Sequence, residues 1–426
     1  MSATSWVLRG VRPLGADPVD LYVEDGVIVD APLSGAETYD AGGLIALPGL
    51  VDLHTHLREP GREDAETVET GTLAAALGGF TAVHAMANTE PVADVAGVVE
   101  QVWRLGQDAG HCDVHPVGAV TLGLRGEQIA ELGAMAESAA RVRVFSDDGH
   151  CVHDPMVMRR ALEYLRAFDG VIAQHAQDPR LTDAAQMNEG VQSARLGLAG
   201  WPAVAEEAVI ARDCLLAAHV GGRVHFCHVS TAGSVELVRW AKGKGWNVTA
   251  EVTPHHLLLT DDLVSTYDPV FKVNPPLRTA EDVAALRAGL ADGTIDAVAT
   301  DHAPHALEDK ETEWAAAAFG MTGLETALSV VVAAMVETGQ LDWAGLADRM
   351  SVRPARIGRL SGQGQPLVPG APANLVLVDS EARWTVDPRQ SASRGRNTPF
   401  AGRELPARVV ATFLRGRPTV LDGKPT

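Results

Sequence analysis

Two histidines separated by a single residue follow a short apolar run. His54 and His56 end the segment GLVDLHTH, and side chains two residues apart on a strand point to the same face. Neutral imidazole is a good zinc ligand, so the pair is a candidate metal site. Because a two-histidine pattern is short, it predicts a metal site only if other potential ligands occur elsewhere in the chain.

Other potential metal ligands also follow apolar runs. They are His175 after GVIAQ, His228 after RVHFC, Asp148 shortly after RVRVF, and Asp301 after DAVAT. Any one of them alone is better explained as a core or surface residue. If the runs are strands of one barrel, however, their carboxyl ends converge on one face. The whole set then predicts a cluster of nitrogen and oxygen ligands that is large enough for two adjacent metal ions.

The middle of the chain has the rhythm of a framework that would bring these residues together. Between about 50 and 360, eight short apolar runs alternate with amphipathic helical stretches, which is typical of a (β/α)8 TIM barrel. The apolar runs are 50–53, 80–86, 114–120, 142–145, 171–174, 224–227, 248–252 and 297–299, and the helical stretches include 67–77, 98–106, 155–168, 203–218 and 279–290. Residues 1–49 and 361–426 have a short-strand pattern instead, and we expect them to form one small β-sandwich.

Composition limits the classes of partner. The 426 residues carry a formal net charge of -20, which argues against nucleic acid and anionic membranes. The four cysteines form no CxxC pair, as expected in a reducing cytosol, and the first ten residues do not resemble a signal peptide. The longest apolar run, 327–336, is too short to cross a bilayer and predicts a buried helix. We therefore expect a cytoplasmic protein that acts on a small molecule.

A series of segments, in chain order, resembles the motifs of the amidohydrolase superfamily and, more narrowly, of type I dihydroorotases. The segments are VDLHTHLREPG, GGFTAV with MANTEP, FSDDG, VTPHHLL, KVNPPLR, ATDHAPH and FGMTGLET. The resemblance runs from about residue 44 to 360, and the flanking β segments fit it. No single motif decides the assignment, but the ordered set is highly specific.

The resemblance implies a centre with one or two zinc ions, two being expected. His54, His56 and Asp301 would bind one ion, and His175 and His228 the other, with an acidic group and a hydroxide bridging them. Many superfamily members use a carboxylated lysine as the bridge, but all five lysines of this chain lie after the sixth apolar run. The type I pattern favours Asp148 as the bridge. Asp147 is the alternative, because neighbouring residues cannot both point inward equally.

The resemblance also implies the reaction, the interconversion of N-carbamoyl-L-aspartate and (S)-dihydroorotate in pyrimidine (UMP) synthesis. Zinc would lower the pKa of its water toward about 7, and Asp301 would act as general base and then general acid. The implied substrate contacts are His56, Arg58, Asn88, Asn274, His305, Phe319 and Gly320.

Alternatives stay open for several of these residues. Taken alone, Arg58 could form a surface ion pair with Glu59, and Asn88 could be a turn residue. The pair at 255–256 could line the pocket or serve packing. The segment 306–318 could be a lid over the site or a solvated loop.

Two departures from the family pattern stand close to proposed site residues. The family usually reads HCED where this chain has His175-Ala176-Gln177-Asp178, and usually has proline where Ala87 precedes Asn88. Competing functions are another cyclic-amide hydrolase, such as a dihydropyrimidinase, hydantoinase or allantoinase, and a non-catalytic scaffold for aspartate transcarbamoylase. The first group generally uses the lysine bridge, and the second has lost ligands. A homodimer and an association with transcarbamoylase are family-level expectations.

Overall fold

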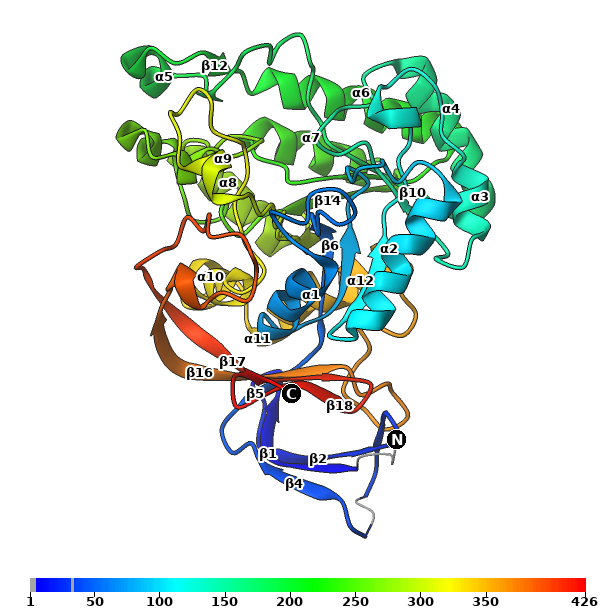
Figure 1. Ribbon diagram of the computed structural model, residues 1–426, viewed down its shortest axis with the longest axis vertical. Helices are drawn as coiled ribbons and strands as arrows, with labels where there is room; N and C mark the ends of the chain where they lie inside the picture. The colour runs from blue at the N-terminus through cyan, green and yellow to red at the C-terminus, as the bar shows by residue number, and fades with distance from the viewer. Residues whose placement is uncertain (1–4, 32–33) are drawn as a thin grey trace.

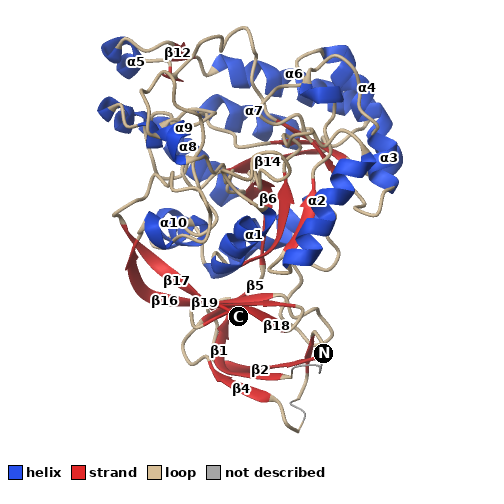
Figure 2. Cartoon of the chain, in the orientation of Figure 1, coloured by secondary structure: helices blue, strands red, loops and turns tan. Residues whose placement is uncertain are grey.

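The computed structural model describes residues 5–31 and 34–426, and shows an α/β body with a β-sheet layer at one end (Figures 1 and 2). The first four residues of the N-terminal stretch, in which no signal peptide was expected, lie outside the described residues. Within the described ranges, the structure has no helix with the length and apolar character needed to cross a membrane.

The body is built around parallel strands that coincide with the predicted apolar runs. They are β6 (Leu50–Thr55), β7 (Phe80–Ala85), β8 (Asp113–Pro116), β9 (Val144–Phe145), β10 (Val171–Gln174), β13 (Val224–Phe226), β14 (Val248–Val252) and β15 (Ala297–Val298). Each neighbouring pair within the two sheets is parallel. Isolated parallel bridges, Gly118 with Phe145 and Thr55 with His302, join the two sheets at both seams. In the described part of the chain, these eight strands therefore close into one ring.

Helices connect the strands, and their ends carry the expected capping residues. The longer ones are α1 (Val68–Leu77), α2 (Ala96–Ala109), α4 (Pro155–Leu165), α6 (Val204–Val220), α7 (Ala232–Gly243) and α8 (Ala280–Asp292). Thr67 and Thr70 form a capping box at α1, Asp154 caps α4 ahead of Pro155, and Thr279 caps α8. A side-chain oxygen at this position accepts from backbone N–H groups that have no partner within the helix.

Shorter elements fill the connections. They are α3 (Leu132–Glu137), α5 (Val191–Leu196), α9 (Leu307–Lys310), α10 (Ala327–Val331), α11 (Trp343–Ala347), α12 (Arg353–Ile357), the strand pair β11 (Met187–Asn188) and β12 (Gly200–Trp201), and the single turns η1 (Leu122–Leu124), η2 (Arg166–Phe168), η3 (Asp261–Thr266), η4 (Pro269–Phe271), η5 (Val332–Val336), η6 (Asp348–Val352) and η7 (Pro388–Gln390). The predicted buried helix over 327–336 is α10 continued by the π-helical turn η5, with Val330 and Val331 fully buried.

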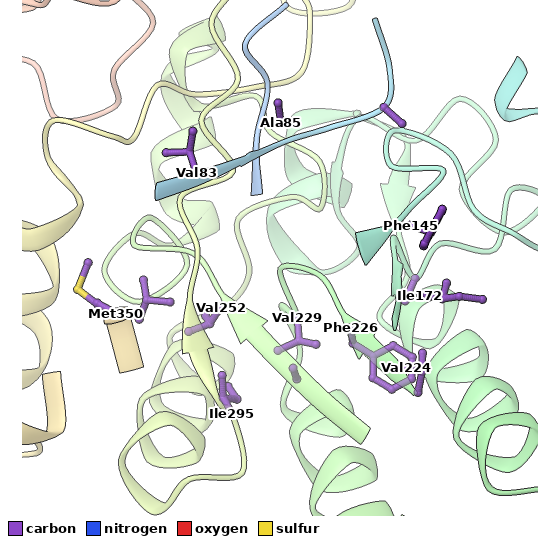
Figure 3. Close-up of a cluster of buried hydrophobic side chains, with 14 of the residues drawn as sticks. Val83, Ala85, Phe145, Ile172, Val224, Phe226, Val229, Val252, Ile295 and Met350 are labelled. Carbon is purple, nitrogen blue, oxygen red and sulfur yellow. The ribbon is translucent and has the colours of Figure 1, made fainter. Parts of the chain in front are cut away.

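Apolar side chains fill the space between the strands and the helices. Figure 3 shows Phe145, Ile172, Phe226 and Val252 among them, from four different strands. All four are fully buried. Parallel strands are covered on both faces, so their sequences are almost continuously apolar and the ring has a rigid interior.

The two ends of the chain share one sheet. The N-terminal strands are β1 (Trp6–Pro13), β2 (Val19–Glu24), β3 (Val27–Val29), β4 (Glu37–Asp40) and β5 (Ile45–Pro48), and the C-terminal strands are β16 (Leu375–Thr385), β17 (Glu404–Leu414), β18 (Arg417–Leu421) and β19 (Lys424–Pro425). Strand β5 pairs with β16, and the rings of Trp6 and Phe413 meet at 5.6 Å between centroids. The hydrogen bonding is continuous through β5 and β1, so one sheet bends over and its N- and C-terminal halves enclose a common core, in the place where the sequence predicted a small β-sandwich.

The segment between β16 and β17 returns to the α/β body. Val386, Phe400 and Leu405 pack with Leu259 and Met321 of the body in one buried cluster. The division at residue 360 that the sequence suggested therefore stays a prediction, because part of the C-terminal region packs against the α/β body.

Candidate active site

Potential metal ligands from five strand ends meet at the carboxyl edge of the ring. His56 Nε2 lies 3.1 Å from Asp301 Oδ1, and His175 Nδ1 lies 3.0 Å from His228 Nε2. All the residues of the cluster are at most 6% exposed. The cluster consists of His54, His56, Asp148, His175, His228 and Asp301, the six residues that the sequence predicted as ligands.

Asp148 stands between two groups of histidines. Its Oδ1 lies 3.3 Å from His54 Nε2 and 3.1 Å from His175 Nδ1, and its Oδ2 lies 3.3 Å from His56 Nε2. Asp147 points away and accepts hydrogen bonds from the backbone N–H groups of Val120 and Thr121. These contacts place Asp148, not Asp147, in the cluster.

The cluster has the chemistry of a metal site. His54 Nε2 is buried and has no hydrogen-bond partner among the described residues, although it faces Asp148 and Asp301. Two three-ligand groups share Asp148: one with His54 and His56, the other with His175 and His228. Imidazole and carboxylate donors in sets of three suit zinc, so these residues fit one or two such ions.

The charges within the cluster are strongly coupled. Burial alone would lower the pKa of His54, but Asp148 and Asp301 raise it well above its usual value. Burial alone would raise the pKa of Asp301, but His54 and His56 hold it well below its usual range. Asp301 is therefore a carboxylate at neutral pH, and a bound cation would take over the role of the imidazole charges.

A cation and two neutral polar groups lie beside the cluster. Arg58 Nε donates to Pro304 O at 3.1 Å, and although burial lowers the pKa of Arg58 to about 10, the guanidinium stays charged at neutral pH. Asn88 Oδ1 lies 2.9 Å from His56 Nδ1, so its side chain faces the site. Burial, with Arg58 nearby, lowers the pKa of His305 to about 3 and keeps it neutral.

The alternative for Arg58 was a surface ion pair with Glu59, and the structure does not show that pair among the described residues. Glu59 accepts a hydrogen bond from Val68 N at 2.8 Å, and no ion pair joins it to Arg58 in the part of the chain that the structure describes. The guanidinium therefore has no carboxylate partner within those residues, and it is near enough to His305 to help lower the pKa of that imidazole.

The remaining predicted contacts, Phe319, Gly320 and Asn274, contact other site residues or their neighbours. His305 Nε2 lies 2.8 Å from Phe319 O, and Gly320 N donates to Lys272 O. Gly320 has φ 143°, and a Cβ atom there would lie 2.7 Å from His305 Nε2. Only glycine fits this close approach, which keeps the backbone of 319–320 packed against the His305 ring. Asn274 Nδ2 donates to Gln177 Oε1 at 3.1 Å.

The two histidines after β14 differ in surroundings. His256 Nε2 lies 3.2 Å from Pro275 O, and its Nδ1 lies 2.8 Å from Thr253 Oγ1, so His256 holds two loops together. His255 Nε2 is buried without a partner among the described residues. Burial lowers the pKa of His255 to about 4, Asp301 opposes this shift and His228 adds to it, so the ring lies near both of these cluster residues.

Comparison with known proteins shows which family has this arrangement. A family model described as Dihydro-orotase-like matches residues 43–234. The dihydroorotase of Streptomyces coelicolor is 69% identical over 425 residues, which cover 99% of both chains. The chain belongs to the dihydroorotase family. A second relative, the dihydroorotase of Mycobacterium tuberculosis, is 58% identical over 426 residues, which cover 99% of both chains.

Solved structures with the same fold include other members of the amidohydrolase superfamily. The L-hydantoinase (dihydropyrimidinase) from Arthrobacter aurescens has a TM-score of 0.87 at 26% identity, covering 99% of this chain and 97% of its own. The dihydropyrimidinase from Brevibacillus agri has a TM-score of 0.83 at 21% identity, covering 100% and 96%, which is a likeness of fold alone. In this dihydroorotase-family chain, Asp148 lies between the two histidine groups.

Sequence reasoning missed several residues that support the site. They are Gln177, Glu251, Lys310 and Asn397, each of which contacts a predicted site residue. A signal existed for Glu251, because a carboxylate inside the apolar run 248–252 requires a buried partner. For Asn397 there was none, since it lies far along the chain, in the segment expected to belong to the small β unit.

Proposed function

We propose that this protein catalyses the reversible cyclisation of N-carbamoyl-L-aspartate to (S)-dihydroorotate in pyrimidine synthesis. One observation carries the proposal: a charged Arg58 and neutral Asn88 and His305 adjoin the six-ligand cluster. This arrangement suits a substrate that bears a carboxylate beside a reacting amide. The high identity to dihydroorotases supports the same reaction. We also interpret the closed ring of strands as the (β/α)8 barrel expected from the sequence.

We propose zinc as the metal, because imidazole predominates among the donors. His54, His56 and Asp301 would hold one ion, His175 and His228 a second, and Asp148 would lie between them. When bound, zinc would polarise a carbonyl oxygen and supply a water that ionises near neutral pH.

The proton transfers are assigned to Asp301. Its lowered pKa keeps it ionised, so in hydrolysis it accepts the proton of the attacking water. It then donates that proton to the leaving amide nitrogen, and in cyclisation the order is reversed. Arg58 would orient the substrate by paired hydrogen bonds to its carboxylate, with Asn88 and His305 beside it. Asn274 and the backbone of 319–320 would contact the amide groups of the ring.

The test is turnover by zinc-loaded protein in both directions, beside Asp301→Asn with its zinc content measured. Turnover that is lost in the variant while zinc is retained would support Asp301 as acid and base. No turnover with zinc bound, but hydrolysis of hydantoin or allantoin, would replace the proposal with another cyclic-amide hydrolase. Neither turnover nor zinc would favour a non-catalytic scaffold for aspartate transcarbamoylase.

The cellular setting and the partners stay predictions. All four cysteines are buried and free, which supports a reducing cytosol as the compartment. A homodimer, and an association with aspartate transcarbamoylase, would be measured by light scattering of the protein alone and mixed with the transcarbamoylase.

A further inference from the structure

A short chain of hydrogen bonds beside the site has a fixed direction. It begins at the backbone carbonyl of Asp178, which can only accept, and Thr182 Oγ1 donates to it at 2.9 Å. Because the hydroxyl proton is used there, Thr182 Oγ1 can only accept from Gln177 Nε2, which lies 2.8 Å away. The amide of Gln177 is therefore oriented with Nε2 toward Thr182 and Oε1 toward the site.

The oxygen of Gln177 then accepts from two site residues. His175 Nε2 lies 2.6 Å from Gln177 Oε1, and Asn274 Nδ2 lies 3.1 Å from it. An amide oxygen has two lone pairs, so both donors can be accommodated. His175 must carry a proton on Nε2, which leaves Nδ1 as the nitrogen that faces Asp148 and His228 and that a metal ion would take.

The same contact decides what Asn274 presents to a ligand. Since Nδ2 is held by Gln177, Oδ1 must point the other way. Asn274 Oδ1 is buried and has no hydrogen-bond partner among the described residues. A buried acceptor without a donor is costly, so it is expected to meet an N–H group of a bound molecule.

We propose that Gln177 is a positioning residue that sets two groups at once: the tautomer of His175 and the amide orientation of Asn274. Through Asn274, it selects a substrate with an N–H donor at that position, such as the ring amide of dihydroorotate or the ureido group of carbamoyl-aspartate. The identity of the substrate rests on the proposed function, whereas the orientation of the two side chains does not.

Substitutions at positions 177 and 182 test whether Gln177 sets the tautomer of His175 and the orientation of Asn274. Methionine has a similar length but lacks a comparable acceptor, so His175 could change tautomer and Asn274 could rotate. Glutamate keeps the acceptor for both donors and loses only the N–H toward Thr182. Valine at position 182 removes the anchor, so the Gln177 amide could turn over.

The experiment compares Gln177→Met, Gln177→Glu and Thr182→Val with Gln107→Met, an exposed glutamine on α2. For Gln177→Met and Thr182→Val, we expect KM for dihydroorotate to rise about tenfold with kcat changed less than threefold, consistent with the loss of one buried hydrogen bond. Gln177→Glu should restore KM to within about threefold, and Gln107→Met should be unchanged.

Two readouts do not depend on turnover. Nitrogen-15 NMR of labelled histidine in zinc-loaded protein should show His175 protonated at Nε2 in the wild type, and a mixture of tautomers in Gln177→Met. Zinc titration should show one weakened site in Gln177→Met and none in Gln107→Met.

The outcomes separate this proposal from the function on which its substrate rests. If the wild type turns over dihydroorotate but Gln177→Met keeps its KM, tautomer and zinc affinity, Gln177 positions nothing. If the wild type does not turn over dihydroorotate while the NMR and zinc results are as expected, the positioning role stands and the substrate is wrong.

Discussion

Glu251 and His54 are joined inside the ring by a contact of 2.9 Å between Glu251 Oε1 and His54 Nδ1. The other carboxylate oxygen lies 2.9 Å from His225 Nε2, and Glu251 is 1% exposed. Because Nδ1 of His54 is occupied, Nε2 is the atom that faces Asp148 and Asp301. A carboxylate that holds the second nitrogen of a metal-binding histidine fixes the ring and increases its basicity.

The first prediction is that Glu251→Gln weakens zinc binding by about ten- to a hundredfold, the usual effect of losing such a partner. The amide can still accept from His54 but carries no charge, so the imidazole is a poorer ligand. Zinc affinity would be measured by competition with a chelator, with Glu236→Gln on the exposed face of α7 as the control. Equal affinities in both variants would mean that Glu251 is only a packing partner.

The second prediction separates the two neighbouring aspartates. Asp147→Ala removes the acceptor for two backbone N–H groups and the Thr121 hydroxyl, so the free energy of unfolding should fall by about 2 kcal/mol or more. Its zinc content should be unchanged after refolding. Asp148→Ala should lose zinc instead, because both histidine groups share Asp148. Metal analysis and urea unfolding of both variants check this, and zinc loss confined to Asp147→Ala would reverse the assignment.

The pattern of apolar runs was enough to predict the framework of the site. Strands buried on both faces require continuous apolar residues, so runs such as 171–174 and 224–227 could be located without the structure. The ligands that follow those runs could then be placed at one edge of the ring. Asp148 was separable from Asp147 only by resemblance, because alternation of side chains does not say which of two neighbours points inward.

Contacts between distant segments could not be predicted in the same way. Asn397 lies in the segment 386–403, which leaves the terminal sheet to pack on the body. The hydrogen bonds from its side-chain amide to Ala303 O and Gly320 O form only because this segment returns to the body. No local periodicity in the sequence predicts that return. Gln177 could be noticed in the sequence as a departure from the family pattern. Its contacts with Thr182 and Asn274 could not be predicted.

The third prediction concerns Asn397, which is 5% exposed. Its Nδ2 donates to Ala303 O at 2.9 Å and Gly320 O at 3.1 Å, and its Oδ1 accepts from His305 N at 3.2 Å. Asn397→Ala should lower the free energy of unfolding by about 1–3 kcal/mol. It should also raise KM several-fold, because the two loops that we propose to contact the substrate lose their common partner. Steady-state kinetics and urea unfolding test this beside Gln390→Ala, an exposed residue of the same segment; an unchanged KM would contradict it.

The fourth prediction concerns Lys310, whose Nζ donates to Ala318 O within the segment 306–318 and joins that segment to Lys272 O and Gly320 O. Burial, with Lys272 adding to it, lowers the pKa of Lys310 to about 7, whereas the unfolded chain keeps an ordinary value near 10.5. Between these values the unfolded state binds more protons, so the contribution of Lys310 to the free energy of unfolding rises with pH, by at most about 1.4 kcal/mol per pH unit. Urea unfolding of the wild type and Lys310→Met should therefore differ increasingly in favour of the wild type from pH 7 to 9.5. The same buried thiols titrate in both proteins, so their effect cancels in the difference. A difference that stays constant with pH would mean that the three carbonyl groups keep Lys310 protonated, with an ordinary pKa.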